Sequence, residues 1–204
     1  MDELRDYFAD KLEIFGATPR GVDWNSAQSQ EVRFAQLVRI VQGEGPYSLI
    51  DYGSGFGALY DFLKRLGYRL EYYGYDFLPA MVERGLELHP NDPACHFTTL
   101  EDELPQADYV VASGIFNVRL EISDAAWTEN VLQVLSKMNH KSLKGFAFNM
   151  LTKYSDPEYM KPGLFYADPC LFFDHCKREY ARNVALLHDY GLYDFTILVR
   201  KNGG

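Results

Sequence analysis

The sequence predicts an α/β fold in which a mostly parallel sheet of seven strands is covered by helices on both faces. From Tyr47 onward, short apolar segments alternate with longer segments of helical periodicity, the order of a parallel sheet with crossover helices. The strand segments are apolar almost without interruption, as expected for strands buried on both faces. The last two, 183–191 and 194–201, are too close together for a crossover and must pair antiparallel.

Two helices are expected before the first strand. Residues 2–15 have an amphipathic helical pattern, and a second helix begins after Asn25 or Ser26, either of which can cap it. The length of 204 residues fits one domain. We therefore expect a single domain over 1–204, in which residues 1–45 form a helical lid segment and residues 46–204 form the core.

The alternating part of the chain supplies the remaining elements. Strands are expected in seven segments: 47–53, 71–77, 95–100, 107–116, 144–151, 183–191 and 194–201. Helices are expected in four segments: 58–67, 78–89, 124–139 and 169–181. Gly67 ends the first of these helices, and Pro79 stands in the first turn of the second.

Charge and composition exclude several classes of protein. The net charge is −9 and no basic run exceeds two residues, which disfavours a nucleic-acid partner. The N-terminus is acidic, unlike a signal peptide, and no apolar run reaches about 20 residues, so we expect no membrane contact and a cytoplasmic location. The pair His175–Cys176 has no second ligand pair at zinc spacing, so no metal is expected. A monomer or a homodimer is expected.

A glycine-rich segment follows the first predicted strand and opens the next helix. It reads Asp51-Tyr-Gly53-Ser54-Gly55-Phe-Gly57. Glycines there let the backbone turn tightly and approach a ligand closely, and the helix N-terminus favours a carboxylate or phosphate. The spacing is GxGxG rather than the GxGxxG of dinucleotide sites, and the preceding acid suits a cationic ligand better than a pyrophosphate.

Asp76 stands at the end of the second predicted strand. A carboxylate at this place can accept hydrogen bonds from both ribose hydroxyls of a nucleoside. It can also cap the helix that follows, and the two roles are compatible. Phe77 comes next and can press against an adenine ring.

Together, the glycine segment and Tyr75-Asp76-Phe77 resemble motif I and its companion in class I S-adenosylmethionine-dependent methyltransferases of the bacterial small-molecule type. The resemblance spans residues 47–118, and the terminal hairpin agrees with it. It implies a Rossmann-like, doubly wound sheet whose glycine loop meets the amino-acid end of S-adenosylmethionine and whose acid holds the ribose. Four positions match the family pattern: Gly53, Ser54, Gly55 and Asp76.

The resemblance implies further cofactor contacts. The family often has an Asp near the adenine amine after the third strand, where this chain offers three alternatives: Leu100, Glu101 and Asp102. After the fourth strand, the residues where the family's backbone carbonyls meet the methionine ammonium are Ser113, Gly114, Ile115 and Phe116. Segment 16–30 is similar to the N-terminal segment of bacterial methyltransferases encoded near polysaccharide genes, which implies cofactor cover by Arg20, Trp24, Asn25 and Gln28.

Polar side chains beyond the carboxyl ends of the strands are the candidates for the acceptor site. The expected substrate-binding residues are Asn117, Arg119 and Asn149. His188 is the expected general base for a hydroxyl acceptor, because a histidine pKa lies near neutrality; a structural role is the alternative. Tyr154 and Tyr166, on the long connection before the last helix, are expected to close the pocket as further catalytic candidates.

These observations predict methyl transfer from S-adenosylmethionine, with S-adenosylhomocysteine as product, to oxygen or nitrogen of a small molecule such as a sugar or sugar nucleotide. The segment SGIFN stands where enzymes that methylate amino groups of DNA bases carry an Asp/Asn-Pro-Pro-aromatic motif, which argues against such substrates. Two alternatives remain open. One is a NAD-dependent oxidoreductase, which the GxGxG spacing disfavours, and the other is a non-catalytic S-adenosylmethionine-binding partner subunit.

Overall fold

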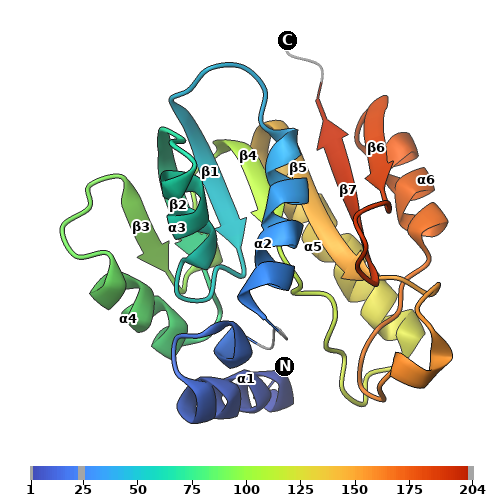
Figure 1. The fold of residues 1–204 in the computed structure, drawn as a ribbon. Coiled ribbons are helices and arrows are strands. Elements are labelled where there is room, and N and C mark those ends of the chain that lie inside the picture. The colour runs from blue at the N-terminus through green and yellow to red at the C-terminus, as the bar shows by residue number, and fades with distance from the viewer. Residues whose placement is uncertain (1, 23–25, 202–204) are drawn as a thin grey trace.

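The computed structural model describes residues 2–22 and 26–201, and one sheet of seven strands forms its centre (Figure 1). The strands are β1 Tyr47–Tyr52, β2 Leu70–Tyr75, β3 Cys95–Thr98, β4 Ala107–Ala112, β5 Ser142–Leu151, β6 Asn183–Leu187 and β7 Asp194–Arg200. Their order in the sheet is β3-β2-β1-β4-β5-β7-β6. Strands β1 to β5 are parallel, and β7 is antiparallel to both β5 and β6. The predicted parallel sheet with an antiparallel hairpin is therefore confirmed.

Helices lie where the sequence predicts them, with small differences at their ends. The α-helices are α1 Asp2–Phe15, α2 Ala27–Leu37, α3 Ala58–Arg65, α4 Pro79–Leu88, α5 Asp124–Lys141 and α6 Pro169–Glu179. Four 3-10 turns join them: η1 Pro19–Val22, η2 Val38–Ile40, η3 Glu101–Glu103 and η4 Pro157–Tyr159. Ser26 caps α2 by accepting a hydrogen bond from the Ser29 backbone N–H. Asn25, the other expected cap, lies outside the described residues.

Most strands end one or two residues earlier than expected, and two of them, β4 and β6, end four residues earlier. β4 stops at Ala112 instead of continuing to Phe116, because Gly114 takes a left-handed conformation with φ of +75° and turns the chain away from the sheet. β6 stops at Leu187, so His188 follows the strand instead of belonging to it. Both early ends matter for the site, because they place loops rather than strand residues at the edge of the sheet.

The sheet separates two layers of apolar side chains. On one face, β-strand residues such as Phe148 pack with Trp127 and Val131 of α5 and with Phe172 of α6. On the other face, the strands pack against α2, η2 and α3, as the opposite positions of α2 and α5 show in Figure 1. This is the doubly wound arrangement that near-continuous apolar strands require. Among the described residues, no helix has the length and apolar character needed to cross a bilayer.

The carboxyl ends of β1, β2, β4 and β5 meet at one edge of the sheet. β7 runs in the opposite direction, so it begins at this edge, where Asp194 pairs with Leu151 at the end of β5. The connections from β1 to β2 and from β4 to β5 cross opposite faces, which opens a crevice between β1 and β4. Ligands of doubly wound sheets bind in such a crevice.

Gly145 gives a direct test of the close packing between β5 and β7. A Cβ atom at this position would lie 2.3 Å from the Val199 carbonyl oxygen. We expect Gly145→Ala to lower the free energy of unfolding by about 1–3 kcal/mol, because the two strands must separate to admit the methyl group. Denaturant unfolding measures the change, with Leu143→Ala, an exposed position on the same strand, as control. Equal stability of the two variants would contradict this strand packing.

Candidate functional site

A cavity of about 1020 Å³ opens at the carboxyl edge of the parallel strands. Its walls come from the loops after β1, β2 and β4, from α1 and α2, and from the segments 155–166 and 191–194. Most of the predicted site residues line it: Asp51, Gly53, Ser54, Gly55, Asp76, Phe77, Glu101, Ser113, Gly114, Ile115, Asn117 and Tyr166. The structure thus brings together residues that are far apart in the sequence.

The glycine loop after β1 is tightly tied to the end of β2. The backbone N–H groups of Gly53 and Ser54 both donate to the Tyr75 carbonyl, at 2.7 and 2.9 Å. A Cβ atom on Gly53 would lie 2.2 Å from Ile115 Cγ2, and Gly53 has a left-handed φ of +82°. A side chain at position 53 would therefore be strained and would have to displace Ile115, which favours glycine here.

Asp76 fixes the glycine loop and the start of α4 at once. Its Oδ2 accepts a hydrogen bond from the Gly55 N–H at 2.9 Å, and its Oδ1 accepts one from the Leu78 N–H at 3.0 Å. Burial raises the pKa of this carboxyl to about 6, although both backbone donors oppose the rise. Each carboxylate oxygen has two lone pairs, so acceptor capacity remains for hydroxyl groups of a ligand. Leu78, not Asp76, is the N-cap of α4, so Asp76 fixes the residue before the helix rather than capping it as expected, and its free acceptor capacity leaves room for the second role.

Asp51 lies at the end of β1, buried under the glycine loop. Its Oδ2 accepts a hydrogen bond from the Tyr72 hydroxyl at 2.7 Å. Burial raises the pKa of Asp51 from 3.8 to about 7, and the Asp76 charge adds to the rise while Tyr72 opposes it. A cation in the cavity would favour the ionised form of Asp51.

For the loop after β3, the structure distinguishes among the three residues expected near the adenine amine. Glu101 lines the cavity, whereas Leu100 and Asp102 are exposed and do not. The Glu101 carboxylate pairs with Lys137 Nζ at 2.7 Å, and both side chains face the cavity. Among the described residues, Glu101 is therefore the acid that this loop offers to a ligand.

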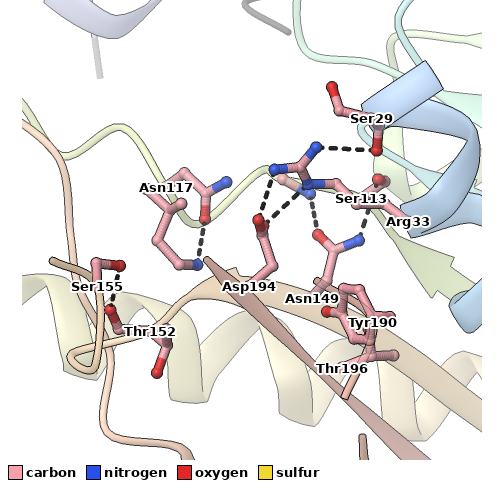
Figure 2. A network of polar contacts seen from close by, with 12 residues as sticks. Ser29, Arg33, Ser113, Asn117, Asn149, Thr152, Ser155, Tyr190, Asp194 and Thr196 are labelled. Atoms are coloured by element: carbon pink, nitrogen blue, oxygen red, sulfur yellow. Dashed lines mark hydrogen bonds and ion pairs between the residues drawn. The ribbon is translucent and has the colours of Figure 1, made fainter. Parts of the chain in front are cut away.

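Two asparagines connect the segment after β4 with β5 next to the cavity (Figure 2). Asn117 follows β4, and Asn149 lies on β5. The Asn149 side-chain oxygen accepts a hydrogen bond from the Gly114 N–H at 2.7 Å, and its nitrogen donates to Ser113 Oγ at 3.3 Å. The Asn117 oxygen accepts one from the Leu151 N–H at 3.0 Å. Asn149 is fully buried and does not line the cavity. It was expected to bind substrate, but in the structure it holds the 113–114 loop.

A buried ion pair at the cavity wall was missed by the sequence analysis. The Arg33 guanidinium of α2 binds the Asp194 carboxylate through two nitrogens, one bond being 3.0 Å from Nε to Oδ1, and donates from Nη1 to the Ser29 carbonyl (Figure 2). Burial raises the pKa of Asp194, and the Arg33 charge opposes that rise. The position of Asp194 at the start of an antiparallel strand could have been a signal, because such a start lies at the carboxyl edge.

Several expected site residues lie away from the cavity. Arg119 binds the Asp124 carboxylate at 2.9 Å and the carbonyls of Leu120 and Ile122, and it does not line the cavity as expected for a substrate-binding residue. Gly57, with φ of +94°, begins α3 beside Phe97 and does not reach the cavity. Two more, Arg20 and Gln28, are exposed outside the cavity walls. Trp24 and Asn25 lie outside the described residues.

Of the three expected catalytic side chains, only Tyr166 lines the cavity. Its hydroxyl accepts a hydrogen bond from the Lys161 N–H at 2.8 Å. His188 and Tyr154 pack against each other with ring centroids 6.0 Å apart, and both are exposed outside the cavity. The reason is the strand order, since β7 separates β6 from the rest of the sheet and leaves His188 at its outer edge. This position does not support the expected general-base role of His188.

The described residues contain no group of three or more His, Cys, Asp and Glu side chains arranged to hold a metal ion. The cavity instead offers backbone amides, carboxylates, aromatic rings and amides. This set of groups suits an organic ligand that carries hydroxyl and cationic groups.

Two solved methyltransferase structures have a similar fold. An O-methyltransferase family protein from Burkholderia thailandensis has a TM-score of 0.65 at 12% identity, over 98% of this chain and 60% of that protein. Human N-acetylserotonin methyltransferase, solved in complex with SAM, has a TM-score of 0.63 at 13% identity, over 97% of this chain and 55% of the human one. This chain thus spans little more than half of either protein, and the likeness confirms the Rossmann-like methyltransferase fold alone.

A close relative in sequence shows the family. No protein-family model matches the chain. The Mycobacterium tuberculosis protein named "Putative methyltransferase Rv1506c" is 48% identical over 164 residues, which make up 80% of this chain and 99% of that protein. The chain therefore belongs to this family of methyltransferases.

The raised pKa of Asp51 predicts a pH-dependent stability. The folded state holds a proton on Asp51 up to a pKa of about 7, whereas the unfolded chain releases it near 3.8. The folded state thus binds more protons between these values, and the free energy of unfolding falls as the pH rises, by at most about 1.4 kcal/mol per pH unit. Asp51→Asn removes this contribution, so denaturant unfolding of wild type and variant should diverge across this range. Parallel pH profiles would contradict the buried carboxyl.

Asn149 is expected to matter for stability through its contact with the Gly114 N–H. Asn149→Leu leaves this N–H without its acceptor and should lower the free energy of unfolding by about 1–3 kcal/mol. Ser113→Ala removes only the longer contact of 3.3 Å and should have the smaller effect. Thermal and denaturant unfolding measure both variants, and equal losses would show that Asn149 does not hold the loop through its oxygen.

Proposed function

We propose that this methyltransferase uses S-adenosylmethionine as methyl donor and transfers the methyl group to oxygen or nitrogen of a small molecule. The observation that carries the proposal is the Gly53–Gly55 loop bound to Asp76 at the crevice between β1 and β4. The human relative in fold was solved in complex with SAM, which supports the same donor here.

The residues present fit this cofactor. Gly53, Ser54 and Gly55 line the cavity, so the backbone of this loop can contact a ligand directly. Asp76 retains acceptor capacity for ribose hydroxyls, and Phe77 and Glu101 suit the adenine end. Asp51 and the carbonyls of the 113–114 loop suit the ammonium of the amino-acid end. Arg33 lines the cavity, whereas the expected Arg20 does not, and its guanidinium is bound to Asp194.

When bound, S-adenosylmethionine supplies a methyl group activated by a positive sulfonium. The protein then contributes mainly proximity, orientation and exclusion of water. The cavity of about 1020 Å³ is large enough to hold a second molecule beside the cofactor. Tyr166 remains the catalytic candidate at its wall, whereas the buried carboxylates Asp51 and Asp194 are bound to Tyr72 and Arg33.

A binding and turnover experiment separates this proposal from the alternative of a non-catalytic partner subunit. Isothermal titration with S-adenosylmethionine measures cofactor binding, and formation of S-adenosylhomocysteine in the presence of mixed small-molecule acceptors measures turnover. Binding with turnover is expected. Binding without turnover for any acceptor class supports the non-catalytic subunit, and absence of binding rejects the cofactor.

Asp76→Ala tests the ribose contact. We expect it to weaken binding of S-adenosylhomocysteine by about 1–3 kcal/mol, since charge-assisted hydrogen bonds are lost. Asp76→Asn, which keeps one acceptor oxygen, should lose less. Asp108→Ala is the matched control, because the Asp108 carboxylate accepts a hydrogen bond from the Ser48 N–H and pairs with Lys144 near the amino end of β4, at the opposite edge of the sheet. Isothermal titration on variants with native circular dichroism gives the answer, and unchanged affinity for Asp76→Ala rejects the assignment.

A further inference from the structure

The part of the cavity away from the glycine loop has a different character from the cofactor side. It is lined by η4 and the segment after it, and by the turn between β6 and β7. If the proposed function holds, this part receives the acceptor, because the cofactor residues lie at the crevice between β1 and β4. The side chains that line it therefore indicate which kind of acceptor can bind.

Two tyrosine rings form the outer wall of this part. Tyr159 ends η4 and Tyr193 precedes β7, and their ring centroids lie 6.0 Å apart with an angle of 35° between the planes. They remain 62% and 39% exposed, although both line the cavity. Large rings left open to solvent beside a cavity provide apolar area that a ligand can cover.

The Tyr193 ring is held in place by its hydroxyl. This hydroxyl donates a hydrogen bond to the Asp156 carboxylate, which raises the pKa of Tyr193 to about 12. The Tyr193 hydroxyl is therefore already committed within the protein. What this side chain offers the cavity is chiefly its ring.

Polar residues line the same cavity as the two rings. Glu158 and Lys161 are close to Tyr159 in sequence and line the cavity. Asn130 of α5 and Asn117 line it as well. Within the described part of the chain, neither Glu158 nor Asn130 makes a side-chain hydrogen bond or ion pair. The cavity thus combines an apolar ring surface with hydrogen-bond donors and acceptors, and Glu158 and Lys161 carry opposite charges. This combination matches a ligand with many hydroxyl groups and little net charge.

The cations of the cavity do not form a phosphate site. Arg33 is bound to Asp194, and Lys137 is bound to Glu101. Lys11 lies over the Tyr7 ring at 5.3 Å from its centroid. Lys161 shares this cavity with the acidic Glu158. A pyrophosphate needs clustered positive charge, so a sugar nucleotide suits this wall poorly.

We propose that the acceptor is a neutral sugar ring that lays its apolar face against Tyr159 and Tyr193. Its hydroxyl groups are then met by Asn117, Asn130, Glu158 and Lys161. This proposal rests on the proposed function for the position of the methyl donor, and it narrows the acceptor from small molecules in general to uncharged glycosides.

Saturation-transfer NMR tests the proposal on the full chain saturated with S-adenosylhomocysteine. The probes are methyl glycosides of glucose, galactose, mannose, rhamnose and fucose, with UDP-glucose and catechol as the charged and the aromatic alternatives. We expect at least one methyl glycoside to bind, with strongest transfer to the protons of one ring face. Tyr159→Ala and Tyr193→Ala should each weaken that binding about tenfold, as loss of a ring contact predicts.

Matched variants and a separate cofactor measurement decide the outcome. Tyr154→Ala removes a ring that is 60% exposed outside the cavity and should leave glycoside binding unchanged. Tyr193→Phe keeps the ring and should retain most of the binding. Preference for UDP-glucose or catechol, absence of glycoside binding, or binding insensitive to Tyr159→Ala overturns the proposal. Titration of S-adenosylhomocysteine shows whether the cofactor assignment survives, because the tyrosine variants should not alter its affinity.

Discussion

The site depends on one buried carboxylate that holds two loops of the sheet edge together. Asp76 accepts hydrogen bonds from the Gly55 and Leu78 N–H groups, so the loop after β1 and the start of α4 share one anchor. The Tyr75 carbonyl adds two bonds to the same loop. Gly53 and Gly55 have no side chains to pack, so these hydrogen bonds help to fix the shape of the loop before a ligand arrives. The cradle is preorganised by the end of the neighbouring strand.

Around this anchor, the cavity is assembled from segments that are distant in the chain. Asn149 on β5 fixes the 113–114 loop, and the Arg33–Asp194 pair joins α2 to the start of β7. A buried ion pair adds little net stability, because desolvation offsets the attraction, but breaking it leaves an uncompensated charge. The pair therefore favours one arrangement of the N-terminal helices over the sheet. The two sides of the cavity differ accordingly, with backbone and carboxylate groups on one side and tyrosine rings on the other.

The sequence predicts the fold well for two reasons. The strands are almost continuously apolar, and the glycine segment falls between a strand and a helix. The cofactor side follows from the same logic, since Asp76 and Ser113 lie at strand ends, and parallel strands end at one edge. The acceptor side was harder to predict. His188 and Arg119 were expected there because His188 lies near the end of a predicted strand and Arg119 follows one, but the place of β6 in the sheet and the contact with Asp124 remove them.

Long-range partners were the information that the sequence lacked. Arg33 and Asp194 are separated by most of the chain, and no local periodicity connects them. Tyr159 and Tyr193 meet only because the turn before β7 and the η4 segment lie against the same cavity. Likewise, the choice of Glu101 over Leu100 depends on the direction of η3, which composition does not specify.

The central claim is that Asp76 and the Gly53–Gly55 loop form a preorganised nucleoside site for S-adenosylmethionine. A crystal structure of the protein with S-adenosylhomocysteine, accompanied by a soak with NAD, tests it most directly. The account predicts the adenosine in the crevice between β1 and β4, with its ribose hydroxyls on Asp76 and the loop unmoved. A nucleoside bound elsewhere, or NAD occupying the crevice in its place, would contradict it.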